Sequence, residues 1–295
     1  MVTPGARFGV FLSITTLLDS GDEMIVIEPA WPAYKDCALN AGIKVRTIKT
    51  TLETNWEPSV EQINNAINEN TKMIVLNYPN NPTGKILSNE LLDSIIQIAK
   101  EHDLYVLSDE IYSEYTLGAS GRMTNLQHTS ALEFGYKKSI IAESFSKWKA
   151  MTGYRIGYAI AESSIIDKMS KLQALSLTNV SEPIQYVALQ ALKSEEAVAE
   201  NSKIMKSRLD ALVKIAKDIG LKFIEPDGAM YLFAKTKYKN FDATKFSEKL
   251  LEHGVAIAPG EGFGDYKEFF RITAIDETRL KKGMTILDTV LKETV

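Results

Sequence analysis

Four short runs of apolar residues divide the first 160 residues of the chain. The runs cover residues 24–27, 72–76, 104–107 and 139–142, and none of them alternates regularly between apolar and polar positions. A strand with one face in water would show that alternation, so continuous apolar runs of this length are typical of strands covered on both faces. Each run is therefore predicted to form an inner strand of a sheet.

The segments between these runs have helical spacing. Residues 89–100, for example, place Leu91, Leu92, Ile95 and Ile96 about one helical turn apart. Strands that alternate with helices indicate a mostly parallel sheet, because each crossover helix returns the chain to the same end of the sheet. We expect helices on both faces of this sheet.

After about residue 160 the pattern changes to long helices followed by short strands. A helical region is predicted over residues 182–219, with a break near Ser194. Strands are expected at 221–224, 229–233, 255–257 and 269–273, and helices at 243–253 and 277–292. The sequence thus predicts an α/β chain with a large domain over residues 1–195 and a smaller α+β C-terminal domain over residues 196–295.

The composition is that of an ordinary globular protein. Of the 295 residues, 45% are hydrophobic and 24% are charged, and the formal net charge is −4. A slightly acidic chain is a poor partner for nucleic acid or an anionic membrane surface, and no apolar stretch is long enough to span a bilayer. Cys37 is the single cysteine, and the first residues lack the order of a signal peptide. A cytoplasmic location is the expectation.

Three polar residues follow predicted strands, and Asn81 does so within a turn-rich segment. Asn81, Asp109 and Lys147 come after the runs at 72–76, 104–107 and 139–142. In open α/β sheets, ligands bind outside the carboxyl ends of the strands. We therefore expect these three side chains to converge on one ligand.

The segment around Lys147 indicates what that ligand is. A lysine amine forms a Schiff base with an aldehyde. Ser144 lies three residues before the lysine and Arg155 eight residues after it, and a hydroxyl with a guanidinium can hold a phosphate. A cofactor that carries both an aldehyde and a phosphate fits this arrangement, which points to pyridoxal 5'-phosphate.

Other chemistry was weighed on the same residues. Ser144-x-x-Lys147 also matches penicillin-recognising hydrolases, but the Ser-Asp-Asn and Lys-Thr-Gly motifs that they require do not occur. Residues 260–264 are rich in glycine without the spacing of a dinucleotide-binding loop. The three histidines are far apart and show no metal-ligand spacing, so no metal site is predicted.

An ordered set of motifs resembles one known family over essentially the whole chain. The chain resembles the class I and II aminotransferases, which are fold-type I pyridoxal phosphate enzymes related to aspartate aminotransferase. The matching segments are residues 29–34, 80–84, 108–112, 144–147, 151–157, 259–264 and 270–272. Each motif alone is weak evidence for the family, but together the motifs occur in the order and at the spacing that the family shows.

The resemblance implies a role for each matching residue around the cofactor ring. Lys147 would form the Schiff base and then transfer protons. Asp109 would pair with the pyridine nitrogen, while Tyr112 and Asn81 would share the phenolic oxygen and Trp31 would stack on the ring. Ordinary structural explanations stay open at this point, since an aspartate can cap a helix and a tryptophan can fill a core.

The resemblance also implies how the two ends of the ligand are held. The start of a helix at Gly5, Ala6 and Arg7 would bind the phosphate together with Ser144 and Arg155. Arg271, with Asn81, would bind the carboxylate of the substrate. A structural ion pair is the alternative explanation for Arg271, because an arginine among apolar neighbours is costly unless it is paired.

From the family we expect a seven-stranded-type, mostly parallel sheet, a homodimer, and transfer of an amino group between an L-amino acid and a 2-oxo acid. Aspartate, alanine or aromatic amino acids are possible substrates. The rivals are another pyridoxal phosphate reaction, such as C–S β-lyase activity, and a cofactor-binding protein with impaired catalysis. The second rival arises because the chain starts where family members already have an N-terminal segment behind them, which normally contributes a lid and a tyrosine to the partner's phosphate site.

Overall fold

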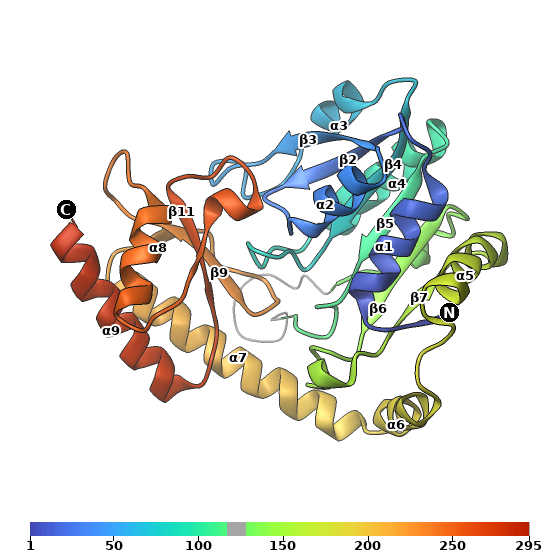
Figure 1. The fold of residues 1–295 in the computed structure, drawn as a ribbon. Coiled ribbons are helices and arrows are strands. Elements are labelled where there is room, and N and C mark those ends of the chain that lie inside the picture. Colours follow the sequence, from blue (N-terminus) through green and yellow to red (C-terminus); the bar gives the residue numbers. More distant parts are fainter. Residues whose placement is uncertain (117–127, 295) are drawn as a thin grey trace.

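The computed structural model describes residues 1–116 and 128–294 (Figure 1). Its larger sheet has seven strands in the order β1-β7-β6-β5-β4-β2-β3. Strands β2, β3, β4, β5 and β6 pair in parallel, whereas β7 is antiparallel to β6 and β1 is antiparallel to β7. The strands are Val2–Thr3, Glu23–Glu28, Lys44–Lys49, Thr71–Asn77, Tyr105–Asp109, Ser139–Ser144 and Gly157–Ile160, for β1 to β7. The predicted mostly parallel sheet is confirmed.

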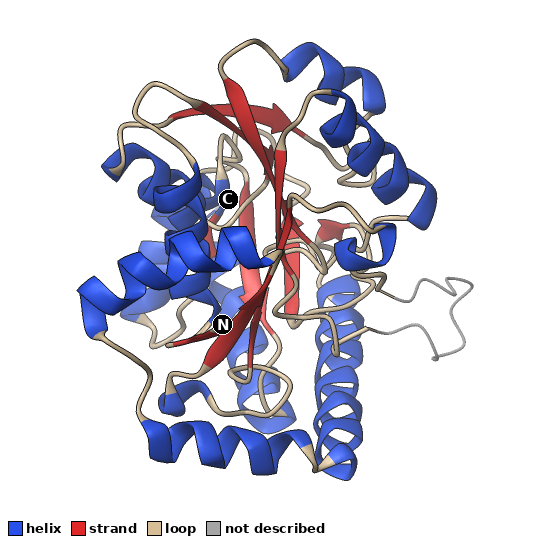
Figure 2. Cartoon of the chain, turned by 90° about the vertical axis from the view of Figure 1, so that its right-hand side faces the viewer, coloured by secondary structure: helices blue, strands red, loops and turns tan. Residues whose placement is uncertain are grey.

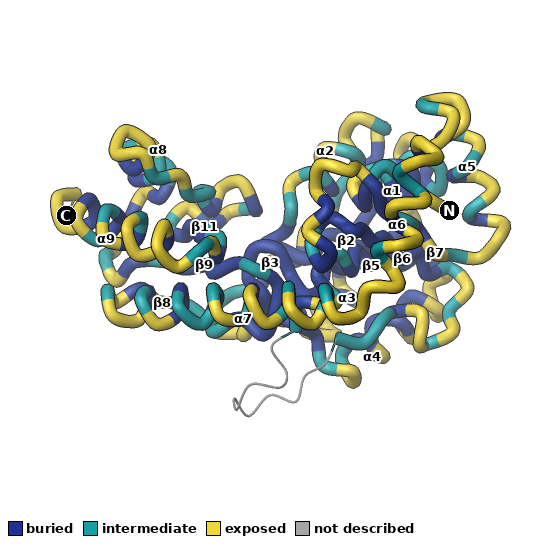
Figure 3. Tube along the Cα trace, turned by 90° about the horizontal axis from the view of Figure 1, so that it is seen from below, coloured by how far each residue is buried: buried dark blue, intermediate teal, exposed yellow. Residues whose placement is uncertain are grey.

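Helices cover both faces of this sheet, as Figure 2 shows. Apolar side chains of α1 (Ala6–Leu17), α2 (Ala33–Asn40) and α5 (Ser163–Leu177) form one core with the sheet. Those of α3 (Val60–Ala66) and α4 (Asn89–Glu101) form a second core on the other face. The inner strands have no exposed residues along β2 and β6 (Figure 3), which explains why their sequence is continuously apolar.

The chain then forms α6 (Glu182–Leu192), the long helix α7 (Glu195–Asp218), and a four-stranded antiparallel sheet in the order β10-β11-β9-β8. These strands are Lys222–Phe223, Tyr231–Lys235, Ala258–Pro259 and Phe269–Thr273, for β8 to β11. Helices α7, α8 (Ala243–Glu252) and α9 (Glu277–Thr294) share a core with this sheet. The predicted helical region with its break near Ser194 is confirmed.

The predicted strand at residues 255–257 is wrong. The amide of Val255 donates to the carbonyl of Leu250 at 3.0 Å, so this residue belongs to the turn that ends α8. Only Ala258 and Pro259 pair with β11. The apolar run resembles a strand in sequence, but Val255 at its start belongs to the turn that follows helix α8.

The predicted domain boundary between residues 195 and 196 falls at the first residue of α7 and stays a prediction. Side chains on both sides of it, such as Phe145 and Leu209, belong to one apolar cluster. Within the described ranges, no helix combines the length and the apolar character needed to cross a membrane.

Three short 3₁₀ helices complete the described elements: η1 (Ala131–Phe134), η2 (Thr152–Tyr154) and η3 (Gly260–Phe263). Two of them matter for the site below. Helix η2 lies between Lys147 and Arg155, and η3 directly follows β10. Helix η2 therefore connects two predicted ligand-binding residues, and η3 lies between β10 and β11, the strand that carries Arg271.

Candidate active site

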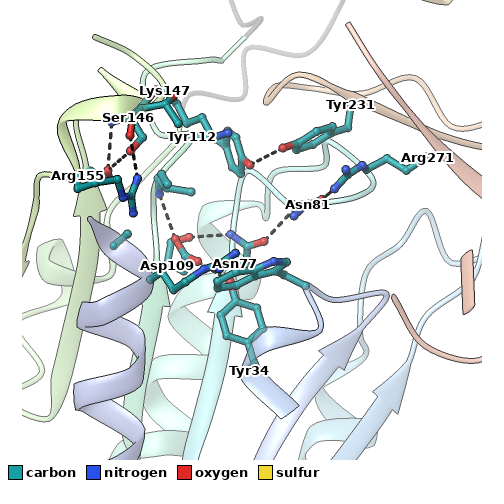
Figure 4. A pocket seen from close by; sticks show the side chains of 16 residues that line it. Tyr34, Asn77, Asn81, Asp109, Tyr112, Ser146, Lys147, Arg155, Tyr231 and Arg271 are labelled. Carbon is teal, nitrogen blue, oxygen red and sulfur yellow. Dashed lines mark hydrogen bonds between the residues drawn. The ribbon is translucent and has the colours of Figure 1, made fainter. Parts of the chain in front are cut away.

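A cavity of about 490 Å³ opens where β4, β5 and β6 end, between these strands, the start of α1 and the smaller sheet (Figure 4). Every residue that the sequence singled out for the site lines it except Gly5, which directly precedes α1. The lining residues predicted from sequence are Ala6, Arg7, Trp31, Asn81, Asp109, Tyr112, Ser144, Lys147, Arg155 and Arg271. Residues up to 265 positions apart in sequence (271 − 6 = 265) are thus brought to one cavity.

Asp109 is a buried carboxylate at the end of β5. Its Oδ2 accepts a hydrogen bond from the Tyr34 hydroxyl at 2.5 Å, and its backbone carbonyl accepts one from Asn77 Nδ2 at 3.0 Å. Burial raises the pKa of Asp109 to about 6, although the Tyr34 hydrogen bond acts in the opposite direction. A buried acid with a raised pKa gains from a cation placed beside it, and a protonated ring nitrogen is such a cation.

Removing the Tyr34 hydroxyl should shift the pH dependence of cofactor binding. Because that hydrogen bond favours the ionised carboxylate, Tyr34→Phe should raise the pKa of Asp109 above its value of about 6. Affinity for pyridoxal phosphate should then start to fall at a higher pH as the solution is acidified. Spectroscopic titration of cofactor binding between about pH 5 and 8, which brackets that pKa from below and above, measures this.

Substitution of an exposed tyrosine provides the matched control for this experiment. Tyr186 lies on α6, is 63% exposed and does not line the cavity. Tyr186→Phe should leave the pH dependence of cofactor binding unchanged. An identical profile for Tyr34→Phe and the unsubstituted protein would contradict the role of Tyr34.

The opposite end of the cavity is built for a small anion. Gly5 has a φ of 86°, a backbone conformation that strains other residues, and a Cβ at this position would displace the Arg155 side chain, whose Nη2 would lie 2.6 Å away. The Arg155 guanidinium donates to the carbonyls of Thr152 at 2.9 Å and Pro4 at 3.3 Å. With the free amides at the start of α1, these groups form a cationic cradle for a phosphate.

Ser144 borders this cradle from β6. Its hydroxyl lies 2.9 Å from Ser146 Oγ and 3.1 Å from the carbonyl of Ile156, and it accepts the amide of Ser146 at 3.1 Å. The sequence did not single out Ser146, although it also lines the cavity. The two hydroxyls are held next to each other and can both turn toward an anion.

Lys147 follows β6 and is half-buried, with its Nζ 5.8 Å from the centre of the Tyr112 ring. Its carbonyl accepts hydrogen bonds from the Tyr115 hydroxyl at 2.6 Å and from the Ala150 amide at 2.9 Å. On either side, Phe145 and Trp148 stack on each other and are buried. The backbone is thus fixed while the amine extends freely into the cavity (Figure 4).

Arg271 approaches from β11 in the smaller sheet. Its Nη1 donates to Asn81 Oδ1 at 2.8 Å, and its guanidinium lies over the Tyr231 ring at 4.3 Å. Its Nε is buried and has no hydrogen-bond partner. Among the described residues, no carboxylate lies within ion-pair distance of Arg271, so the structural ion pair considered as an alternative is not present in that part of the chain. A partly buried cation without a counterion is suited to bind an anionic ligand.

Sequence reasoning missed several lining residues, of which Tyr34 and Tyr231 are the most important. The Tyr231 hydroxyl lies 2.8 Å from that of Tyr112, and the two rings meet edge to face. Tyr34 lies in the first turn of α2, three residues after Trp31 in the same matching motif, and its ring contacts the Trp31 ring edge to face. That spacing is the signal from which Tyr34 could have been found.

These features fit pyridoxal phosphate at three separate points. Asp109 offers a buried acid for a ring nitrogen, the Gly5–Arg155 cradle offers room and charge for a phosphate, and Lys147 offers an amine between them. The half-buried Trp31 ring borders the same cavity, in edge-to-face contact with Tyr34. The donor set therefore agrees with the cofactor predicted from the sequence.

Comparison with protein families decides the classification. The model of the family "Aminotransferase class I and II" matches residues 1–287. The chain belongs to the aminotransferase class I and II family. It is therefore a pyridoxal-phosphate-dependent transaminase, as its ordered motifs predicted.

Similar aminotransferases are found in several organisms. The chain is 37% identical to the aspartate aminotransferase of Pyrococcus horikoshii over 99% of its own length and 75% of the relative. It is 30% identical to aromatic-amino-acid aminotransferase 2 of Thermococcus litoralis, with 99% and 76% covered. The crystal structure of aspartate aminotransferase from Thermotoga maritima superposes with a TM-score of 0.91 at 33% identity, covering 99% of this chain and 76% of that one.

Proposed function

We propose that this transaminase acts on an amino dicarboxylic acid, such as aspartate or glutamate, and on the corresponding 2-oxo acid. Two observations support this choice. Several similar proteins are named aspartate aminotransferases. In addition, four cationic side chains line the cavity, namely Arg7, Lys147, Arg155 and Arg271, against the single described carboxylate of Asp109. This excess of positive charge is the observation that carries the proposal.

Pyridoxal phosphate supplies an aldehyde that receives the amino group and a ring that withdraws electrons from the substrate Cα. We assign Lys147 to the aldehyde of the cofactor, which its amine would hold, and to proton transfer, in which the same amine would carry a proton to and from the substrate Cα. Its Nζ lies 5.8 Å from the centre of the Tyr112 ring, and its half-buried side chain lines the same cavity as the phosphate cradle. A positioned amine of this kind acts as general base and general acid in turn.

Asp109 is assigned to the ring nitrogen, with Tyr34 orienting its carboxylate. Tyr112 and Asn81 are assigned to the phenolic oxygen, and Trp31 to one face of the ring. The backbone of Asn81 is held in place because its backbone N–H donates a hydrogen bond to Asn77 Oδ1 at 3.0 Å. The Asp109 carboxylate in its low-dielectric pocket would favour a protonated ring nitrogen, and the chemistry that such a ring would supply is electron withdrawal.

The remaining residues are assigned to the two anionic groups at the ends. Gly5, Ala6, Arg7, Ser144 and Arg155 bind the phosphate, the first three through the backbone at the start of α1. Arg271 binds the substrate α-carboxylate beside Asn81, with its planar guanidinium already held over Tyr231 at 4.3 Å. A bidentate pair between guanidinium and carboxylate fixes the orientation of the Cα–H bond.

The side chain of Arg7 is then available for the second carboxylate of the substrate. It is exposed, lines the cavity and lies 4.9 Å from the centre of the Trp31 ring. Arg7→Ser should lower kcat/KM for aspartate about tenfold or more, because a charge-assisted hydrogen bond contributes roughly 1.5–3 kcal/mol. The kcat/KM for alanine, which has no second carboxylate, should change much less. Steady-state assays with both amino acids measure the difference.

Arg7→Lys provides the control for that measurement, since it keeps the charge at the same place. Equal losses for aspartate and alanine in Arg7→Ser would contradict the proposed role, because they would indicate damage to cofactor binding. The backbone amide of residue 7, which we assign to the phosphate, is retained in both variants.

The function itself is tested by absorption spectra of the cofactor-loaded protein with single amino acids. Conversion of the bound cofactor to its aminated form by aspartate or glutamate, and reversal by a 2-oxo acid, would support transamination of dicarboxylic substrates. Pyruvate and ammonia released from cysteine conjugates without an acceptor would favour the β-lyase alternative. A cofactor spectrum that responds to no amino acid would favour the non-catalytic alternative.

We also propose that the protein is a cytoplasmic homodimer. Exposed apolar side chains on α5 and α6 support self-association, with Leu175 at the end of α5 being 86% exposed and Leu189 and Leu192 on α6 being 53% and 48% exposed. Several large apolar side chains exposed on consecutive helices are typical of an interaction surface. Sedimentation equilibrium measures the state, and a monomer at micromolar concentration would contradict the proposal.

A further inference from the structure

A buried ion pair between residues without an assigned role connects the segment that follows Asn81 with the segment that leads into strand β9 of the smaller sheet. Lys85 Nζ lies 2.5 Å from Asp227 Oδ2, and the side chains are only 7% and 8% exposed. The desolvation of two buried charges costs about as much as their attraction returns, so such a pair contributes little net stability. A pair of this kind is suited instead to fix one segment relative to another.

Backbone contacts show which segments the pair fixes. The amides of Asp227 and Gly228 both donate to the carbonyl of Gly84, at 2.9 and 2.8 Å, and Asp227 Oδ2 also accepts the amide of Ile86 at 3.3 Å. Gly84 has a φ of 73°, and a Cβ there would lie 2.4 Å from Pro226 Cβ. Residues 226–228 therefore lie directly against the loop that carries Asn81.

The opposite side of this segment is equally close to the turn that carries Tyr112. A Cβ on Gly228 would lie 2.4 Å from the carbonyl of Tyr115, and the same carbonyl accepts the amide of Ala229 at 2.8 Å. We call residues 226–229, held between the Asn81 loop and the Tyr112 turn, the joint. These close contacts leave no room for a side chain on Gly228 of the joint or on Gly84 of the neighbouring loop.

The joint leads directly into the strands that carry the substrate end of the cavity. Two residues beyond it, Tyr231 begins β9 and meets Tyr112, hydroxyl to hydroxyl, at 2.8 Å. Strand β9 pairs with β11, where Phe233 is opposite Arg271, and Arg271 reaches back to Asn81 at 2.8 Å. A shift of the joint would therefore move Tyr231 and Arg271 together relative to Tyr112 and Asn81.

We propose that Lys85 and Asp227 are positioning residues of the transamination reaction, whose buried ion pair holds the joint and thereby sets the distance between Arg271 and the cofactor-binding residues Asn81 and Tyr112. The proposal rests on the assignment of Arg271 to the substrate carboxylate. It predicts that loss of the pair weakens binding of a carboxylate ligand more than binding of the cofactor. A pair that only stabilised the fold would weaken both through unfolding.

Lys85→Met, Asp227→Asn and Lys85→Arg in the cofactor-loaded protein test this. Succinate, a dicarboxylate that cannot react, is titrated by calorimetry, and pyridoxal phosphate affinity is measured separately. Loss of the ion pair should displace Arg271 by about 1 Å relative to Asn81 and Tyr112. We therefore expect succinate affinity to fall about tenfold in Lys85→Met and Asp227→Asn, whereas cofactor affinity should change less than about threefold. Lys85→Arg keeps the charge and should retain most of the affinity.

Amide hydrogen exchange of residues 226–235 gives an independent measurement on the same variants. Exchange of this segment should be faster in Lys85→Met than in the unsubstituted protein, while the strands of the larger sheet should be unchanged. The matched control is Glu277→Gln with Lys281→Met, which removes an exposed ion pair of 2.7 Å on α9. This control should alter neither succinate affinity nor exchange in the joint.

Parallel losses of succinate affinity, cofactor affinity and melting temperature in Lys85→Met would overturn the proposal, as would unchanged exchange in residues 226–235. Failure of the substrate assignment looks different, because Arg271→Met would then bind succinate as well as the unsubstituted protein does. In that case the exchange measurement alone decides whether the ion pair holds the joint.

Discussion

Lys147→Ala should lose transamination almost completely while still folding. A positioned general base typically contributes about 10²–10⁴-fold to the rate, and this substitution also removes the amine assigned to bind the aldehyde. The backbone of the segment is held through the Lys147 carbonyl by Tyr115 and Ala150, neither of which depends on the amine. Single-turnover spectra with aspartate measure the loss, and circular dichroism checks the fold.

Lys171→Ala provides the matched control, because this lysine is exposed on α5 and does not line the cavity. Its rate should equal that of the unsubstituted protein. Normal turnover by Lys147→Ala would be incompatible with the mechanism proposed for this site, whatever its effect on cofactor affinity.

Asp109→Asn should have opposite effects on catalysis and on the stability of the cofactor-free protein. An amide cannot keep the ring nitrogen protonated, so the turnover rate should fall about 10²–10³-fold, as for removal of other preorganised electrostatic groups. In the cofactor-free protein the same change removes a buried charge and keeps an oxygen for the Tyr34 hydroxyl. The free energy of unfolding at pH 8 should therefore rise.

The direction follows from the raised pKa of Asp109. Burial brings this pKa from 3.8 to about 6, so the folded protein without cofactor binds the proton more tightly than the unfolded chain does. Stability contributed by the protonated acid is present below about pH 4 and is lost as the pH rises through about 6, with a total of about 3 kcal/mol. In Asp109→Asn, the free energy of unfolding should therefore not show this fall between about pH 4 and 6.

Denaturant unfolding at pH 5 and pH 8, with and without pyridoxal phosphate, measures both effects. Asp167→Asn, an exposed substitution on α5, should reproduce the unsubstituted protein. Lower stability of cofactor-free Asp109→Asn at pH 8 would show that the carboxylate is not under strain in the empty cavity.

The inner strands could be predicted from sequence because burial on both faces leaves a continuous apolar run. The edge strand β3 could not, since five of its six residues are charged, polar or only half-buried and only Ile48 is buried. Similarly, β7 has four residues and begins with a glycine. These strands form because a neighbouring strand provides hydrogen bonds, and that information is not local in the sequence.

The site shows the same division between local and distant information. Motif order indicated Lys147, Asp109 and Arg271, because each lies in a short and recognisable segment. The partners of these residues depend on tertiary contacts instead. Tyr34 meets Asp109 across 75 positions, and Arg271 meets Asn81 across 190. No spacing rule for helices or strands reaches that far, so those contacts required the structure.

The pairing of the first strand with the seventh has a consequence for the order in which the cavity assembles during folding. Val2 pairs with Tyr158, and Gly5 borders the guanidinium of Arg155. Gly5 and Arg155 are 150 positions apart (155 − 5 = 150), and contacts of such long sequence separation form slowly. The phosphate cradle therefore closes only once β7 has joined the sheet, and Arg271 completes the cavity only once β11 has paired with β9.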